Sequence, residues 1–167
     1  VRVLLSALAK RVVETEDSEL LNEQNLSNAI YGLQGMSSEY AEVCEAVSAL
    51  SMKIPFVREE LGAQAIGMIF FGLQRMSSTP TEVRHLLSLL TAKIANSTMK
   101  LDSQAICSAL YGLQCMHCQE EEVRELLATL AIKITESDVQ LDPLKFTMAL
   151  YGLQNMKEDV QEVKEIL

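Results

Sequence analysis

The sequence has little proline and glycine, few cysteines, no long apolar run and a shortage of basic residues. Three prolines and seven glycines in 167 residues argue against a low-complexity or disordered chain. The four cysteines, at positions 44, 107, 115 and 118, form no paired framework, which favours an intracellular, reducing compartment over a disulfide-stapled secreted module. No apolar run approaches the roughly 20 residues of a membrane-spanning helix, so we expect no membrane partner.

The shortage of basic residues bears on the ligand. Acidic residues outnumber basic ones by 23 to 14, and the formal net charge is −9. A nucleic-acid-binding protein usually carries a basic stripe that displaces counterions from phosphates, and this chain lacks that excess. The length and the apolar content of 49% suit one domain with a continuous core.

A six-residue motif returns every forty residues. Its four copies are Tyr31-Gly32-Leu33-Gln34-Gly35-Met36, Phe71-Gly72-Leu73-Gln74-Arg75-Met76, Tyr111-Gly112-Leu113-Gln114-Cys115-Met116 and Tyr151-Gly152-Leu153-Gln154-Asn155-Met156. A fixed period of this size is typical of a repeat array. We therefore predict one repeat domain over 1–167, with the second helix of a partial repeat in 1–20, full repeats at 21–60, 61–100 and 101–140, and a truncated repeat at 141–167. Both ends match the interior of a repeat, so we expect further repeats of the same parent chain.

Each repeat is expected to hold two helices. We call equivalent positions in successive repeats a column. The first helix follows a column of N-cap residues: Asn22, Gly62, Asp102 and Asp142. Pro143 then occupies the first helical position of its repeat. The second helix follows another column of cap residues: Glu39, Thr79, Gln119 and Asp159. A glutamate stands three residues after each of them, and residues 79–82 match a capping box. No segment alternates with period two. The prediction is an all-α, right-handed α-solenoid of stacked helix-turn-helix repeats, with helices of about 14 residues.

Three further columns have structural interpretations. Glycines inside the first helix would cost about 1 kcal/mol each, so we expect a neighbouring helix to approach them closely: Gly32, Gly72, Gly112 and Gly152. Lysines in the last turn of the second helix suit its dipole: Lys53, Lys93 and Lys133. A basic column at the start of that helix could form a phosphate-binding ridge, but a locally neutralised face is favoured: Arg2, Arg84, Arg124 and Lys164.

An aromatic residue holds one position while its neighbours vary. This pattern suits a groove that stacks successive flat groups and discriminates among them with a changing side chain. The alternative is that each ring wedges against the adjacent repeat, and the glutamines three residues on are expected to form an amide ladder between repeats. The predicted binding residues are Asn28, Tyr31, Met68, Phe71, Arg75, Ser108, Tyr111, Cys115, Met148, Tyr151 and Asn155.

The first helices of the repeats carry a family resemblance. The stretch Leu101-Asp102-Ser103-Gln104-Ala105-Ile106-Cys107-Ser108-Ala109-Leu110-Tyr111-Gly112-Leu113, together with Leu141-Asp142-Pro143, resembles the first helix of octotricopeptide-like repeats and their heptatricopeptide relatives. The resemblance extends over every repeat. It implies a helical-hairpin solenoid that binds RNA, typically in chloroplasts or mitochondria.

The predicted function is non-catalytic binding. Single-stranded RNA along the surface of the first helices is the first expectation. The alternative is a scaffold for an extended peptide or partner helix, which the acidic balance and the adaptable side chains of Met68, Met148 and Leu144 favour. Cys115-Met116-His117-Cys118 has no second ligand pair, so no metal site is expected. No catalytic dyad or phosphate loop recurs, so no enzyme activity, cofactor or small-molecule substrate is expected.

Overall fold

The computed structural model describes residues 1–15 and 22–156, and within those ranges it is all-helical, without a strand. The all-α prediction is therefore confirmed for this part of the chain. The predicted cap residue Asp159, the glutamate three residues after it (Glu162) and Lys164 of the basic column lie outside the described residues. The elements are α1 (Arg2–Glu14), α2 (Glu23–Tyr31), α3 (Ala41–Ser51), the 3-10 helix η1 (Ile54–Phe56), α4 (Ala63–Gly72), α5 (Thr81–Ala95), α6 (Ser103–Tyr111), α7 (Glu121–Thr135) and α8 (Pro143–Gly152).

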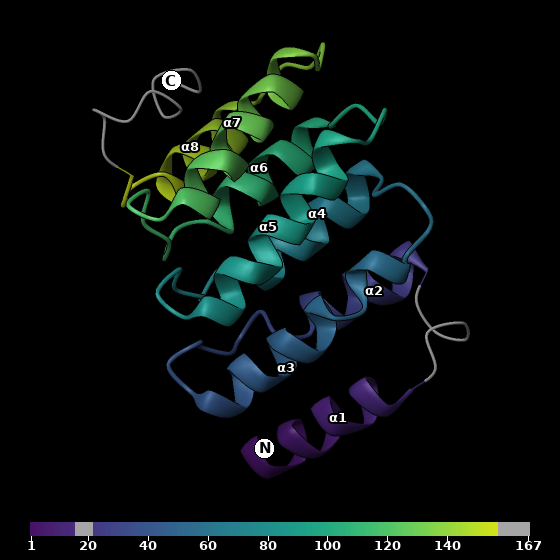
Figure 1. Cartoon of the computed structure of the whole chain (residues 1–167). Helices are drawn as coiled ribbons and strands as arrows, with labels where there is room; N and C mark the ends of the chain where they lie inside the picture. Colours follow the sequence, from purple (N-terminus) through teal and green to yellow (C-terminus); the bar gives the residue numbers. More distant parts are fainter. Residues whose placement is uncertain (16–21, 157–167) are drawn as a thin grey trace.

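The helices form two layers (Figure 1). In one layer α1, α3, α5 and α7 lie side by side, and each contacts the next in that order. The other layer holds α2, α4, α6 and α8, again with each helix against the next. The closest backbone neighbours of most helices are thus their equivalents in the adjoining repeats. We call the second layer the even layer and the first the odd layer.

The main apolar core fills the space between the layers, and a second small cluster of Ala9, Ala46 and Ala49 lies between α1 and α3. The even layer contributes residues such as Leu26, Ile66 and Phe70, and the odd layer contributes Leu86 and Leu87. All five are buried at 0–1% exposure, because apolar residues spaced three or four apart fall on one helix face. The end helices differ: Phe146 of α8 is 53% exposed, whereas its equivalent Ile106 in α6 is 2% exposed.

The first helix of each repeat begins where its cap residue predicts. Asn22, Asp102 and Asp142 each accept a hydrogen bond from the backbone N–H three residues on. Pro143 is the first residue of α8, where the missing N–H costs nothing. Gly62 has no side chain to offer, and its own N–H donates to the Glu23 carboxylate at 2.6 Å. The cap of α4 is therefore tied to the preceding repeat.

The second helices begin one residue later than predicted. Their N-caps are Tyr40, Pro80 and Glu120, and none of these makes a side-chain capping bond. The predicted capping box at 79–82 is wrong, because Pro80 is still in an extended conformation. The Thr79 hydroxyl is hydrogen-bonded with Ser77 instead. Arg84 and Arg124 donate to the carbonyls of the preceding turn, which fixes that turn without a cap.

The first helices are shorter than predicted, at 9 or 10 residues. Each glycine of the repeated column consequently lies at a helix end, not in the interior, so the helix-interior cost that we assigned to it was wrong. The predicted close approach is confirmed at Gly72, Gly112 and Gly152. A Cβ at any of these would come within 3.0 Å of a carbonyl in the preceding even-layer helix. A Cβ at Gly32 would meet only carbonyls of its own helix.

Candidate binding surface

The aromatic column forms a continuous stack across the even layer. The centroids of Tyr31 and Phe71 are 5.9 Å apart, and those of Phe71 and Tyr111 are also 5.9 Å apart. Tyr111 and Tyr151 follow at 6.0 Å. The planes of successive rings differ by only 22–26°. We call this row of four rings the aromatic ladder.

Within the ladder each ring packs against the adjacent repeat. Phe71 and Tyr111 have a neighbouring ring on both sides and are half-buried, whereas Tyr31 and Tyr151 at its two ends are 36% and 51% exposed. Offset stacking at this spacing is a favourable aromatic geometry. Because each inner ring has a stacked neighbour on both sides, its faces are covered more than its edges.

One border of the ladder follows the variable column at positions 35, 75, 115 and 155, all of which are exposed. Arg75 donates through Nη1 to the Gly35 carbonyl at 3.3 Å, and Asn155 donates through Nδ2 to the Gln114 carbonyl at 2.6 Å. Gly35, Arg75 and Cys115 also line a groove of about 590 Å³ that continues past Tyr40 to the start of α1. On this border, side chains that are hydrogen-bonded to the preceding repeat therefore lie beside an open groove.

The other border holds the column at positions 28, 68, 108 and 148. Asn28 is exposed, and Met68 and Met148 are half-buried. Ser108 is buried at 6% exposure and its hydroxyl accepts a hydrogen bond from Gln104 at 3.1 Å. Ser108 thus lies beneath the surface that the other predicted residues form. The structure brings these residues into two rows beside the ladder.

The glutamine column does not form the expected amide ladder. Gln34, Gln74, Gln114 and Gln154 lie in the turn after each first helix. Their side-chain amides make no hydrogen bond to one another within the described ranges. Links between repeats come from a different column: Ser38 accepts from the Ser77 N–H at 2.8 Å, and Ser78 accepts from the His117 N–H at 3.1 Å. The turns are joined by hydroxyl-to-backbone bonds.

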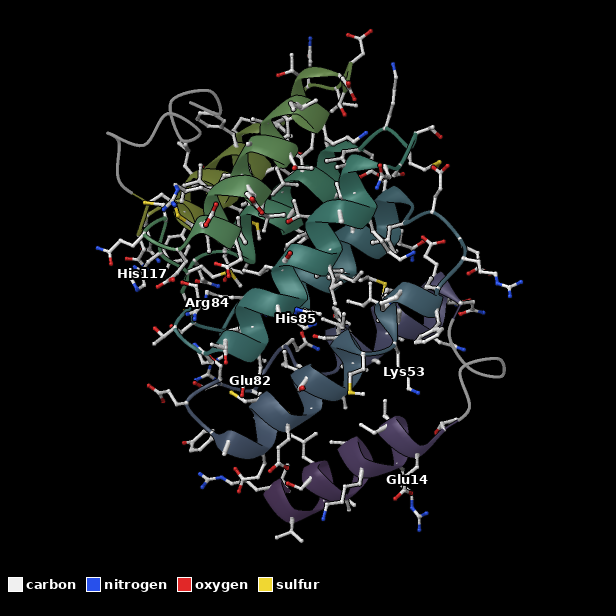
Figure 2. All side chains as sticks on the ribbon, in the orientation of Figure 1. Glu14, Lys53, Glu82, Arg84, His85 and His117 are labelled. Atoms are coloured by element: carbon white, nitrogen blue, oxygen red, sulfur yellow. The ribbon has the colours of Figure 1, made fainter. Side chains whose placement is uncertain are left out.

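The lysine column also links repeats. Lys53 donates to the carbonyl of Thr15, Lys93 to that of Val57 and Lys133 to that of Ser97. Figure 2 shows Lys53 at the end of α3, directed toward the end of α1. We expected each lysine to interact with the dipole of its own helix, but each ammonium reaches the preceding repeat. These side chains hold backbone carbonyls and are partly or fully buried.

Arginines at the start of the second helices are similarly engaged. Nη1 of Arg84 donates to the carbonyls of Ser78 and Thr79, and Nη1 of Arg124 donates to those of Cys118 and Gln119. Arg2, in the partial repeat, lies 3.8 Å from the ring centroid of Tyr40. The neutralised face is the better interpretation of this column.

The cysteine and histidine residues do not converge. Cys115 and His117 are exposed whereas Cys118 is buried, and the described residues contain no group of three or more potential metal ligands. Helices in the described part of the chain are all too short or too polar to cross a membrane. No protein-family model, curated protein or solved structure matches this chain.

Proposed function

We propose that the chain is a segment of a right-handed α-solenoid with a 40-residue period, and that it is a non-catalytic module binding an extended polypeptide along the even layer. The observation that carries this proposal is the closed aromatic ladder with its mostly uncharged borders. The ring edges, the two thioethers of Met68 and Met148, and the border groove of about 590 Å³ offer an adaptable surface for peptide side chains.

The packing of the rings argues for polypeptide over RNA. A platform for single-stranded nucleic acid leaves ring faces open for bases, whereas each inner ring here has a neighbour 5.9–6.0 Å away on either side. Opening the ladder for bases would sacrifice the stacking between repeats, about 0.5–1.5 kcal/mol per pair. An extended peptide needs no such opening, because it can lie across the ring edges.

The disposition of cations supports the same choice. Arg75 is the single charged residue of the predicted binding set, and the lysines at 93 and 133 and the arginines at 84 and 124 donate to backbone carbonyls. Binding to phosphates gains affinity from each cation that displaces counterions. With a formal net charge of −9, the chain offers few such cations.

Selection from a displayed library of unstructured peptides tests the proposal. The purified chain should enrich peptides whose binding weakens in Asn28→Ala and Arg75→Gln, both of which change exposed border residues. His85→Ala, on the exposed side of α5, is the matched control and should leave binding unchanged. Equal loss in the control variant, or no enrichment over an unrelated helical protein, would contradict the proposal.

Single-stranded RNA is the second candidate, supported by the resemblance to octotricopeptide-like repeats and by the absence of carboxylates among the predicted binding residues. Filter binding with random-sequence RNA across a salt series separates the two. Under our proposal no RNA is retained even at low salt. Retention that falls steeply with salt and is weakened in Arg75→Gln would establish RNA as the ligand, with location in chloroplast or mitochondrion then following from the resemblance.

A further inference from the structure

Position 44 departs from the basic column at the start of the odd-layer helices. α5 and α7 carry Arg84 and Arg124 at the equivalent place, and α3 carries Cys44. Nη1 of Arg84 lies 3.2 Å from the Ser78 carbonyl oxygen, and the corresponding distance from Arg124 to Cys118 is 3.0 Å. The repeats 61–100 and 101–140 thus hold a guanidinium in the same slot above the turn, and the repeat 21–60 does not.

The guanidinium of Arg84 serves a second purpose in its slot. Its Nη1 and Nε atoms lie 3.6 Å from the carboxylates of Glu120 and Glu122, respectively, at the start of α7. Figure 2 shows Arg84 and Glu82 near the start of α5. One arginine therefore neutralises the acidic start of the next odd-layer helix while it holds its own turn.

Cys44 cannot do this for the repeat that follows it. Its thiol donates only a weak hydrogen bond to the Ser38 carbonyl, at 3.3 Å. Glu82, the equivalent of Glu122, has the Thr81 hydroxyl at 3.3 Å, and no lysine or arginine in the described ranges forms an ion pair with it. Glu82 also acts on the thiol: burial first, and then the negative charge of Glu82, raise the pKa of Cys44.

A groove of about 820 Å³ opens where the arginine is missing. It lies between α1 and α3 and reaches the start of α5. Apolar residues line it, among them Ala9, Val13, Ala49 and Met52. Its carboxylates are Glu14, Glu39, Glu45 and Glu82, against one cation, Lys10. Glu14 pairs with Arg11 at 3.2 Å, whereas Glu45 and Glu82 accept hydrogen bonds from hydroxyls only, from Ser6 at 2.6 Å and from Thr81 at 3.3 Å.

We propose that this groove binds an arginine side chain of a basic partner polypeptide, with its guanidinium above Cys44 in the slot that Arg84 and Arg124 fill in their own repeats. The planar donors would meet the carbonyls of Ser38 and Glu39 and the carboxylate of Glu82. The aliphatic part of the arginine packs on the apolar lining. Arginine suits the slot better than lysine, because a planar fork can reach several acceptors at once.

The groove lies in the odd layer, away from the aromatic ladder, so this proposal does not rest on the proposed function. The chemistry of the expected ligand follows from charge complementarity and from the arginines that fill the equivalent slot in two other repeats. A groove with an apolar lining and four carboxylates, of which Glu14 has an arginine partner within the chain, favours a basic ligand with an alkyl stem. The partner is thereby defined as an arginine-bearing segment and not as an acidic or neutral one.

Fluorescence anisotropy tests this with a labelled peptide of alternating arginine and alanine and with its lysine counterpart. The arginine peptide should bind more tightly than the lysine peptide. Cys44→Arg should fill the slot from within and weaken the arginine peptide by about tenfold or more. Ile132→Arg is the matched control: it adds the same charge at an exposed position of α7 outside both grooves, and should change affinity by less than about twofold.

A thermal scan of Cys44→Arg verifies that the new side chain occupies the slot, since the variant should unfold at a higher temperature than the parent chain. If that variant does not fold, Glu82→Gln decides the matter, with an expected weakening of the arginine peptide of about fivefold or more. Equal losses in Cys44→Arg and Ile132→Arg would show that the effect comes from net charge alone and would overturn the proposal. Equal affinity for the arginine and lysine peptides, or unchanged binding in Glu82→Gln, would overturn it as well.

Discussion

Gly112 lies directly against the main chain of Phe70, so closely that a Cβ at position 112 would come within 3.0 Å of both the carbonyl oxygen and the carbonyl carbon. Phe70 immediately precedes Phe71, whose ring stacks on Tyr111. The glycine contact and the ring contact therefore belong to one interface between repeats. The close approach of the helices at the glycine accompanies ring spacing near 6 Å.

Gly112→Ala should destabilise the chain. The new methyl group overlaps a backbone carbonyl, which cannot rotate away as a flexible side chain could, so α6 must shift away from α4. Overpacking of this kind costs about 1–3 kcal/mol or more. Urea unfolding followed by circular dichroism measures the change in the free energy of unfolding.

Gly35→Ala is the control for the same substitution. A Cβ at Gly35 meets nothing within 4 Å, and the residue does not have a positive φ. Its free energy of unfolding should stay the same or rise by about 0.4–1 kcal/mol through the unfolded state. An equal loss in both variants would show that intrinsic glycine effects, and not the contact with Phe70, determine the result.

Phe71 and Tyr111 should be energetically coupled. In a double-mutant cycle with Phe71→Leu and Tyr111→Leu, we expect a coupling free energy of about 0.5–1.5 kcal/mol, because the two rings stack directly. Tyr31 and Tyr151, at opposite ends of the ladder, form the control pair and should be additive within about 0.5 kcal/mol. Additivity for the Phe71 and Tyr111 pair would mean that the ring contact contributes no specific stabilisation.

Lys93→Met should leave the Val57 carbonyl without its donor. The methionine keeps most of the aliphatic stem, so the substitution isolates the ammonium, and an unsatisfied, partly buried carbonyl costs about 1–3 kcal/mol. Lys100→Met, at an exposed position outside the lysine column, should change the free energy of unfolding by less than about 0.5 kcal/mol. Chemical denaturation of both variants makes the comparison, and equal effects would show that the link between repeats adds nothing.

The Glu60 carboxylate should make stability depend on acidity. It accepts from the Thr98 N–H at 2.9 Å, the Thr98 hydroxyl at 3.0 Å and the Ser97 hydroxyl at 3.1 Å, and these bonds hold its pKa below the usual 4.5. Because the folded pKa is depressed, the stabilisation is present above the unfolded pKa and is lost as pH falls through the folded pKa.

Thermal unfolding of the parent chain and of Glu60→Gln, measured from neutral pH down through the pKa of the Glu60 carboxyl, tests this effect. The parent should be the more stable of the two at neutral pH, and the difference should shrink as the solution becomes acidic. Glu59→Gln changes the adjacent exposed carboxylate and should show a smaller pH dependence relative to the parent. A constant difference between the parent and Glu60→Gln at all pH values would contradict the assigned hydrogen bonds.

Local features of the sequence were sufficient for the helical content and for the start of each first helix. N-capping by Asn22 or Asp102 depends on a side chain and a backbone N–H three residues apart, so chain-local chemistry decides it. The glycine column was also interpretable, since a repeated absence of Cβ implies a repeated close approach. The second helix start was not, because Pro80 remains in the turn that Arg84 holds from within α5.

The sequence by itself thus determined the type of structure, the buried faces and the columns in which equivalent residues recur, since helical periodicity and capping act within one segment. Only the tertiary structure decided what those columns do. The spacing between repeats closes the aromatic rings on one another, carries Lys93 to a carbonyl of the preceding repeat and opens a groove above Cys44. These outcomes depend on how far a side chain reaches across a helix interface, a distance that neither periodicity nor capping specifies.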